Sequence, residues 1–110
     1  MLTITSEKEN KHDILKLNGE IDASNSVILD EAIQKLAANG SKSILVDGEH
    51  LQYISSAGLG VFMSYLEDFQ EKEIQLKIFG LSARVYEVFK ILGLDQLISI
   101  YPTKVEAILD

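Results

Sequence analysis

The feature that most constrains the fold of this sequence is a regular alternation of strand-like and helix-like segments. Residues 43–47 read Ser-Ile-Leu-Val-Asp, a short run rich in β-branched residues that is typical of a buried strand. Apolar residues recur at helical spacing between Asn25 and Asn39, and again from Ser55 or Ser56 onward. Strands that alternate with helices of about 10 to 15 residues predict parallel strands joined by helical crossovers. We therefore expect an α/β fold.

The N-terminal segment adds an antiparallel pair to this pattern. Residues 2–6 and 13–17 both have strand-like composition, and we expect them to form a hairpin, which makes the sheet mixed. Asn18 and Gly19 then predict a turn after the second strand.

The C-terminal half continues the alternation. Residues 74–78 alternate apolar and polar side chains, which predicts a half-buried strand, and Gly93 ends the helix that follows. A capping-box pattern at Thr103 predicts a terminal helix with apolar side chains turned inward, namely Val105, Ile108 and Leu109. We therefore predict one α/β domain over residues 1–110, with a mixed central sheet of about four to five strands and about four helices.

Composition narrows the class of protein. A chain of 110 residues that is 46% hydrophobic fits one compact domain. No stretch approaches the roughly 20 apolar residues that span a bilayer, and the absence of cysteine suits a reducing compartment, so we expect a cytoplasmic protein without a membrane partner. The net charge of −7 and the single arginine, Arg84, make a phosphate-neutralising surface hard to build. Nucleic acid is therefore not an expected partner.

The sequence contains no constellation typical of an enzyme. The nucleophile elbow of many serine hydrolases has the pattern Gly-x-Ser-x-Gly, and Ser56 lacks the upstream glycine. The two histidines, His12 and His50, fall in predicted loops, where chance surface placement is the simpler interpretation. We expect no catalytic residue and a chain that is not an enzyme.

Cofactor and metal sites are also not expected. Residues 58–60, Gly-Leu-Gly, resemble part of a dinucleotide fingerprint, but Met63 occupies the position of its third glycine. Asp47 and Glu49 form a carboxylate pair without a nearby histidine or further acidic ligands. Ordinary loop solvation explains this pair better than metal binding.

The small residues at 55–60, Ser-Ser-Ala-Gly-Leu-Gly, lie at a predicted junction between a strand and a helix. Such residues leave the backbone and the hydroxyl groups open to a docking partner. Helix capping by a serine hydroxyl is the alternative interpretation. Two glycines in the first turn of a helix each lower its stability by roughly 1 kcal/mol relative to alanine. This cost indicates that the glycines allow a close approach of the backbone to another group.

At this junction the sequence resembles the STAS domain, in particular its stand-alone members, the anti-sigma factor antagonists of bacterial partner-switching systems. Residues 17–22, Leu-Asn-Gly-Glu-Ile-Asp, look like the family's Leu-x-Gly-Glu-Ile/Leu-Asp segment. Residues 53–60 are similar to its Asp/Ser-Ser-Ser/Ala/Thr-Gly-Leu-Gly motif. Val-Phe at 88–89 with Gly-Leu at 93–94, and Glu-Ala at 106–107, extend the resemblance nearly from end to end.

The resemblance implies a phosphorylation switch. It places Ser56, two residues before Gly58, on the family's phosphorylated position. Ser55 falls where many members have aspartate, so this chain offers a second hydroxyl group and Ser55 is a rival phosphoacceptor. The implied partner is an anti-sigma factor with a histidine-kinase-like ATP-binding fold, which binds the unphosphorylated domain, phosphorylates its serine and releases it. A metal-dependent PPM-type serine phosphatase resets the cycle.

The resemblance also implies where that kinase binds. The expected partner-binding residues are Asp22, Asn25, Ser55, Ser56, Ala57, Gly58, Leu59 and Gly60. For Asp22, helix capping is an equally good explanation. A different role for the whole chain is that of a non-switching STAS adaptor or scaffold subunit of a sensor or transporter complex, in which the serine is only a cap.

Overall fold

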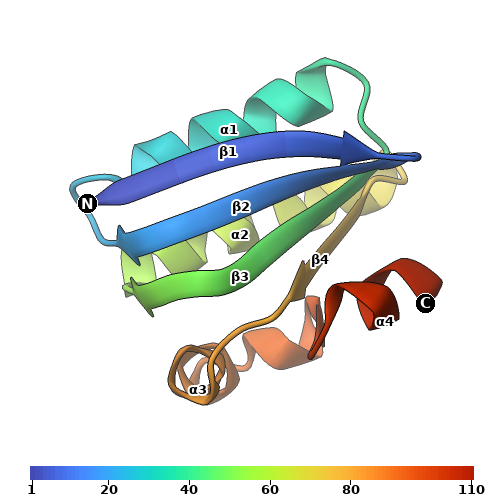
Figure 1. Ribbon diagram of the computed structural model, residues 1–110. Helices are drawn as coiled ribbons and strands as arrows, with labels where there is room; N and C mark the ends of the chain where they lie inside the picture. Colours follow the sequence, from blue (N-terminus) through green and yellow to red (C-terminus); the bar gives the residue numbers. More distant parts are fainter.

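The computed structural model describes all residues, 1–110, and contains one five-stranded sheet. In sequence order the strands are β1 (Leu2–Glu9), β2 (His12–Ile21), β3 (Ser43–Ile54), β4 (Gln75–Phe79) and β5 (Ser99–Tyr101). The strands follow the same order across the sheet, and β1 to β4 can be followed in Figure 1. β1 and β2 are antiparallel and the other neighbours are parallel, which confirms the predicted mixed sheet.

Helices cover both faces of this sheet. They are α1 (Ser26–Ala38), α2 (Ser56–Glu71), α3 (Ala83–Ile91), the 3₁₀ helix η1 (Leu94–Gln96) and α4 (Lys104–Leu109). Buried side chains of α1, α2 and α3 share one core against one face, and α1 and α2 lie side by side behind the sheet in Figure 1. On the opposite face, Ala107 of α4 packs with Ile14, Leu45 and Phe79. None of these helices combines the length and apolar composition that crossing a membrane requires.

β2 continues through Asn18 and Gly19, so the predicted turn at these residues is wrong. The register against β3 shifts between Lys16 and Asn18, and again between Gly19 and Glu20, which marks an irregularity of the β-bulge type. Gly19 has φ of +119°, and a Cβ there would collide with the carbonyl oxygen of Met1. The glycine therefore serves a bulge and a close strand contact and does not reverse the chain.

β3 is much longer than the strand predicted over residues 43–47. It continues to Ile54 because β2 pairs with it along almost its whole length. His50 therefore lies in a strand. His12 begins β2 and is only 5% exposed, with its Nδ1 atom 2.7 Å from Oγ of Ser43. The predicted loop positions of both histidines are wrong.

β4 shows the predicted alternation of apolar and polar residues, but it is not half-buried, because the face that carries Lys77 is covered as well. Lys77 lies on the face opposite the main core and is 7% exposed. Its Nζ atom donates to the carbonyl oxygens of Ala107 at 3.0 Å and Asp110 at 2.8 Å. The ammonium group thus lies at the carboxyl end of α4, where the helix dipole favours a cation.

The terminal helix α4 confirms its predicted cap. Oγ1 of Thr103 accepts a hydrogen bond from the backbone N–H of Glu106 at 3.2 Å. The inward orientation predicted for Val105 and Leu109 is wrong, because both side chains are exposed. The helix has only six residues, and its one fully buried side chain is that of Ala107.

Candidate functional site

Two loops that are distant in the sequence meet at one edge of the sheet. β2 and β3 are parallel and end together, with Ile21 opposite Ile54. The loop after β2, residues 22–25, and the segment after β3, residues 55–60, therefore leave the sheet side by side. A hydrogen bond of 2.9 Å from the N–H of Ser55 to the carbonyl of Ile21 joins them. We call residues 22–25 and 55–60 together the carboxyl edge.

The loop after β2 is held by its own polar side chains. Oδ1 of Asp22 accepts hydrogen bonds from the N–H of Ser24 at 2.9 Å and from its hydroxyl at 2.5 Å. Oδ1 of Asn25 accepts from the N–H of Asp22 at 2.9 Å, and its Nδ2 donates to the carbonyl of Glu20 at 3.0 Å. The side-chain and then the backbone hydrogen bond from Ser24 lower the pKa of Asp22 below its ordinary value. The edge thus presents an exposed, ionised carboxylate.

Helix capping does not explain Asp22. Its two hydrogen-bond donors both belong to Ser24, which precedes α1. The N-cap position of α1 is Asn25, whose side chain makes no capping hydrogen bond and instead stabilises the loop. The carboxylate and the amide therefore shape the loop and do not cap α1, whose first N–H, that of Ser26, donates instead to the backbone carbonyl of Asp22 at 3.0 Å.

The two adjacent serines have different environments. Ser55 is the N-cap residue of α2, yet its Oγ atom is buried and has no hydrogen-bond partner. Helix capping by a serine hydroxyl, the alternative interpretation of this segment, therefore does not apply to Ser55. Ser56 is the first residue of the helix and is exposed. Of the two hydroxyl groups, only that of Ser56 belongs to an exposed residue.

The two glycines of the first turn of α2 also differ. A Cβ on Gly58 would lie 2.7 Å from Cγ2 of Ile21 and 2.7 Å from Cγ1 of Ile54, closer than side chains pack. Gly58 therefore lets the start of α2 approach the ends of β2 and β3. Gly60 is exposed, and a Cβ on it would meet nothing within 4 Å. Leu59, between them, is buried in the main core.

The substitution Ser55→Ala tests the assignment of the buried hydroxyl. We expect it to leave the free energy of unfolding unchanged or to raise it by about 1 kcal/mol, because it removes a buried polar group that has no partner. Urea denaturation measures this change. The matched control is Ser82→Ala, which removes a hydroxyl that caps α3 by accepting from the N–H of Val85 at 3.2 Å. The control should lower the free energy of unfolding by about 1 kcal/mol, and an equal loss in Ser55→Ala would contradict our assignment.

The carboxyl edge therefore combines an exposed hydroxyl at a helix start, a first turn of α2 that no side chain caps, and an ionised carboxylate. An anionic group attached to Ser56 would lie at the positive end of the dipole of α2. No group of three or more His, Cys, Asp or Glu side chains is arranged to hold a metal ion. The edge thus places an exposed hydroxyl group and an ionised carboxylate side by side at the start of α2.

Comparison with protein families identifies the fold. A family model described as "STAS domain" matches residues 3–107. The chain belongs to the STAS domain family. This finding confirms the resemblance carried by the sequence motifs and the STAS-like α/β fold that it implied.

Relatives of this STAS domain include proteins named anti-sigma-B factor antagonist. The anti-sigma-B factor antagonist of Staphylococcus aureus (strain NCTC 8325 / PS 47) is 30% identical over 99 residues, which cover 90% of this chain and 92% of the relative. Two solved structures share the fold at lower identity. An anti-sigma factor antagonist from Mycobacterium paratuberculosis has a TM-score of 0.88 at 21% identity, over 99% of this chain and 92% of that one. The Bacillus cell fate determinant SpoIIAA in its phosphorylated form has a TM-score of 0.72 at 20% identity, over 96% of both chains.

Proposed function

We propose that this STAS domain is an anti-sigma factor antagonist controlled by phosphorylation of Ser56. In its unphosphorylated form it binds an anti-sigma factor that is also a serine kinase, and so releases the sigma factor which that protein holds. The relative from Staphylococcus aureus carries the name of such an antagonist and aligns over nearly its whole length. That alignment supports the same class of partner for this chain.

The observation that carries the assignment of Ser56 is its exposure at the start of α2. A kinase must bring the γ-phosphoryl group of ATP into line with the attacking oxygen, so the acceptor hydroxyl has to enter the kinase active site. The Oγ atom of Ser55 is buried and does not meet this requirement. In the transfer, Oγ of Ser56 bonds to the γ-phosphorus, ADP leaves, and a base of the kinase takes the hydroxyl proton.

The phosphate acts as a switch because of where it is added. It brings about −1.5 to −2 charges, which the N–H groups and the dipole at the start of α2 tolerate, so the domain itself stays folded. At a protein interface the same charge has to lose its water or face other acidic groups, and Asp22 already lies on this edge. Binding is therefore lost while the fold is retained.

The proposed contact surface comprises the exposed part of the carboxyl edge. Asp22, Ser56 and Gly60 are exposed and offer direct contacts. Gly58 and Leu59 are buried and support these residues from beneath. The open space over Gly60 permits the backbone of a partner to come close.

The chemistry of this cycle belongs to the partners. We infer that the chain is substrate and ligand but not catalyst, that it acts in the cytoplasm, and that a metal-dependent PPM-type serine phosphatase returns Ser56 to its free form. Hydrolysis of the phosphoserine restores the neutral hydroxyl and, with it, the affinity for the kinase.

The test is to incubate the purified chain with its cognate anti-sigma factor and ATP, and to measure its intact mass. We expect the addition of one phosphoryl group, and fragment mapping should place it on Ser56. A reaction with a non-hydrolysable ATP analogue is the control, in which the complex forms and the mass stays unchanged. A stable complex whose mass never increases with ATP would contradict the switch and favour the adaptor role.

A further inference from the structure

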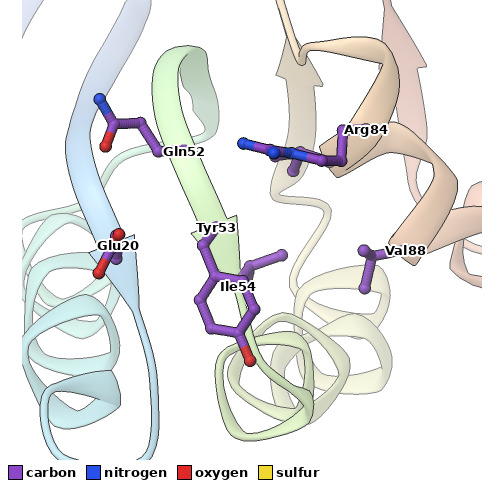
Figure 2. A pocket seen from close by; sticks show the side chains of 7 residues that line it. Glu20, Gln52, Tyr53, Ile54, Arg84 and Val88 are labelled. Atoms are coloured by element: carbon purple, nitrogen blue, oxygen red, sulfur yellow. The ribbon is translucent and has the colours of Figure 1, made fainter.

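An open pocket of about 650 Å³ lies beside the carboxyl edge, between the ends of β2 and β3 and the helix α3 (Figure 2). Its lining residues are Glu20, Gln52, Tyr53, Ile54, Arg84, Val85 and Val88. In Figure 2 the side chain of Arg84 extends from α3 toward β3, and Tyr53 stands at the end of β3 between the two walls. Tyr53 is 50% exposed, although its ring is large and mostly apolar.

Two opposite charges line this pocket, and neither is paired. Arg84, the only arginine of the chain, makes no ion pair and no side-chain hydrogen bond, and the carboxylate of Glu20 makes none either. By contrast, four lysines elsewhere on the surface lie within 3.4 Å of a carboxylate, namely Lys8, Lys16, Lys72 and Lys104. In a chain with 17 acidic and 10 basic residues, the guanidinium group of Arg84 thus lines a partly apolar pocket without an acidic partner.

The pocket is continuous with the carboxyl edge. Glu20 and Tyr53 are opposite each other in the register of β2 and β3, one step before Ile21 and Ile54. Tyr53 is three residues before Ser56, which limits the distance between their Cα atoms to about 10 Å. A specific interface buries roughly 800 Å² on each partner, so a protein bound over Ser56 also reaches this pocket.

We propose that this pocket is a second anchor of the kinase contact and receives an acidic side chain, Asp or Glu, of the anti-sigma factor. The inference rests on the proposed function and adds the chemistry of the partner. Arg84 binds the carboxylate through two parallel N–H donors, and the ring of Tyr53 packs against its aliphatic part. Arginine and tyrosine are the residue types that most often dominate binding energy at interfaces.

The surrounding charges give this anchor a role in orientation. Glu20 in the pocket and Asp22 on the carboxyl edge are exposed carboxylates, so an acidic side chain of the partner is accepted only where it meets Arg84. Like charges placed opposite each other suppress wrong registers of docking. Arg84 thus fixes the position in which Ser56 enters the kinase active site.

The test is the affinity of the unphosphorylated full chain for its cognate anti-sigma factor, measured by calorimetry without ATP. We expect Arg84→Glu to weaken binding at least about tenfold, because it places a carboxylate against a carboxylate. Arg84→Lys should lose a smaller part of the affinity, because lysine keeps the charge but not the two parallel donors. Arg84 is exposed, and a circular dichroism melt checks that both variants stay folded.

The matched control is Lys90→Glu, the same change of charge on an exposed residue of the same helix but outside the pocket. We expect it to change affinity less than about twofold. An Arg84→Glu variant that binds as tightly as Lys90→Glu would overturn the inference about the pocket. If the wild type still acquired phosphate on Ser56, the proposed function would stand. A loss of binding in Arg84→Glu without phosphate uptake by the wild type would support the anchor and overturn the switch. A wild-type chain that binds no anti-sigma factor would overturn both.

Discussion

Ser56→Asp is expected to lower the affinity of this chain for its anti-sigma factor about a hundredfold, which corresponds to ~2.7 kcal/mol. The aspartate places a charge at the exposed start of α2, where it has to be desolvated in the interface and adds to the negative charge of Asp22 on the carboxyl edge. Ser56→Ala should bind as tightly as the wild type, because it adds no charge, and should take up no phosphate. Calorimetry with the anti-sigma factor and intact mass after ATP addition measure the two effects.

The control for this pair is Ser64→Asp. Ser64 is exposed on the same helix, two turns after Ser56, and the substitution changes the net charge by the same amount. We expect its affinity to stay within about twofold of the wild type. If both aspartate variants bound equally well, or if Ser56→Ala still acquired phosphate, the assignment of Ser56 would be wrong.

Gly58→Ala is expected to lower the free energy of unfolding by roughly 1–3 kcal/mol, the usual cost of overpacking a core. The added Cβ would lie 2.7 Å from side-chain atoms of both Ile21 and Ile54, which are themselves buried. Relief requires α2 to move away from the ends of β2 and β3, and this movement displaces Ser56 from the neighbouring loop. Urea denaturation measures the loss of stability. We also expect slower phosphate uptake when the variant is incubated with the anti-sigma factor and ATP and its intact mass is followed.

Gly60→Ala is the matched control for this prediction. A methyl group there meets nothing within 4 Å, and alanine favours a helix over glycine by up to about 1 kcal/mol. Gly58 and Gly60 are two residues apart in the same helix, and we expect their substitutions by alanine to change the free energy of unfolding in opposite directions. A loss of stability in Gly60→Ala similar to that in Gly58→Ala would show that the packing of Gly58 is not the cause.

Much of the fold could be predicted because its signals are local. The alternation of segments identified the sheet and its helices, Gly93 ends α3 with φ of +76°, and Thr103 caps α4. Long-range contacts caused the errors. Asn18 and Gly19 have the composition of a turn, but pairing with β3 holds them in a strand, and Lys77 is buried only because α4 covers it.

The sequence was enough to predict which segment forms the candidate site, but not which hydroxyl group in it is exposed. The sequence indicates small residues at a strand-to-helix junction, and nothing local separates Ser55 from Ser56. The distinction depends on how the end of β3 is joined to β2, where the N–H of Ser55 bonds to the carbonyl of Ile21 and its hydroxyl is buried. The pocket at Arg84 was missed because its lining residues come from β2, β3 and α3. A single arginine in an acidic chain was the one signal that pointed to it.

The order of the strands also determines how directly the chain can fold. Every strand pairs with the strand before it in the sequence, so no pairing waits for a later segment to be inserted between two earlier ones. Only the β1–β2 hairpin closes a short loop, because the parallel pairs join residues that a helical crossover separates, such as Asp13 with Ile44 and Ser43 with Gln75. The hairpin therefore costs little entropy to close, whereas the parallel pairs form more slowly. During synthesis the β1–β2 hairpin, β3 and α2 emerge in that order. Both segments of the carboxyl edge, residues 22–25 and 55–60, are thus synthesised before β4, α3 and the C-terminal elements.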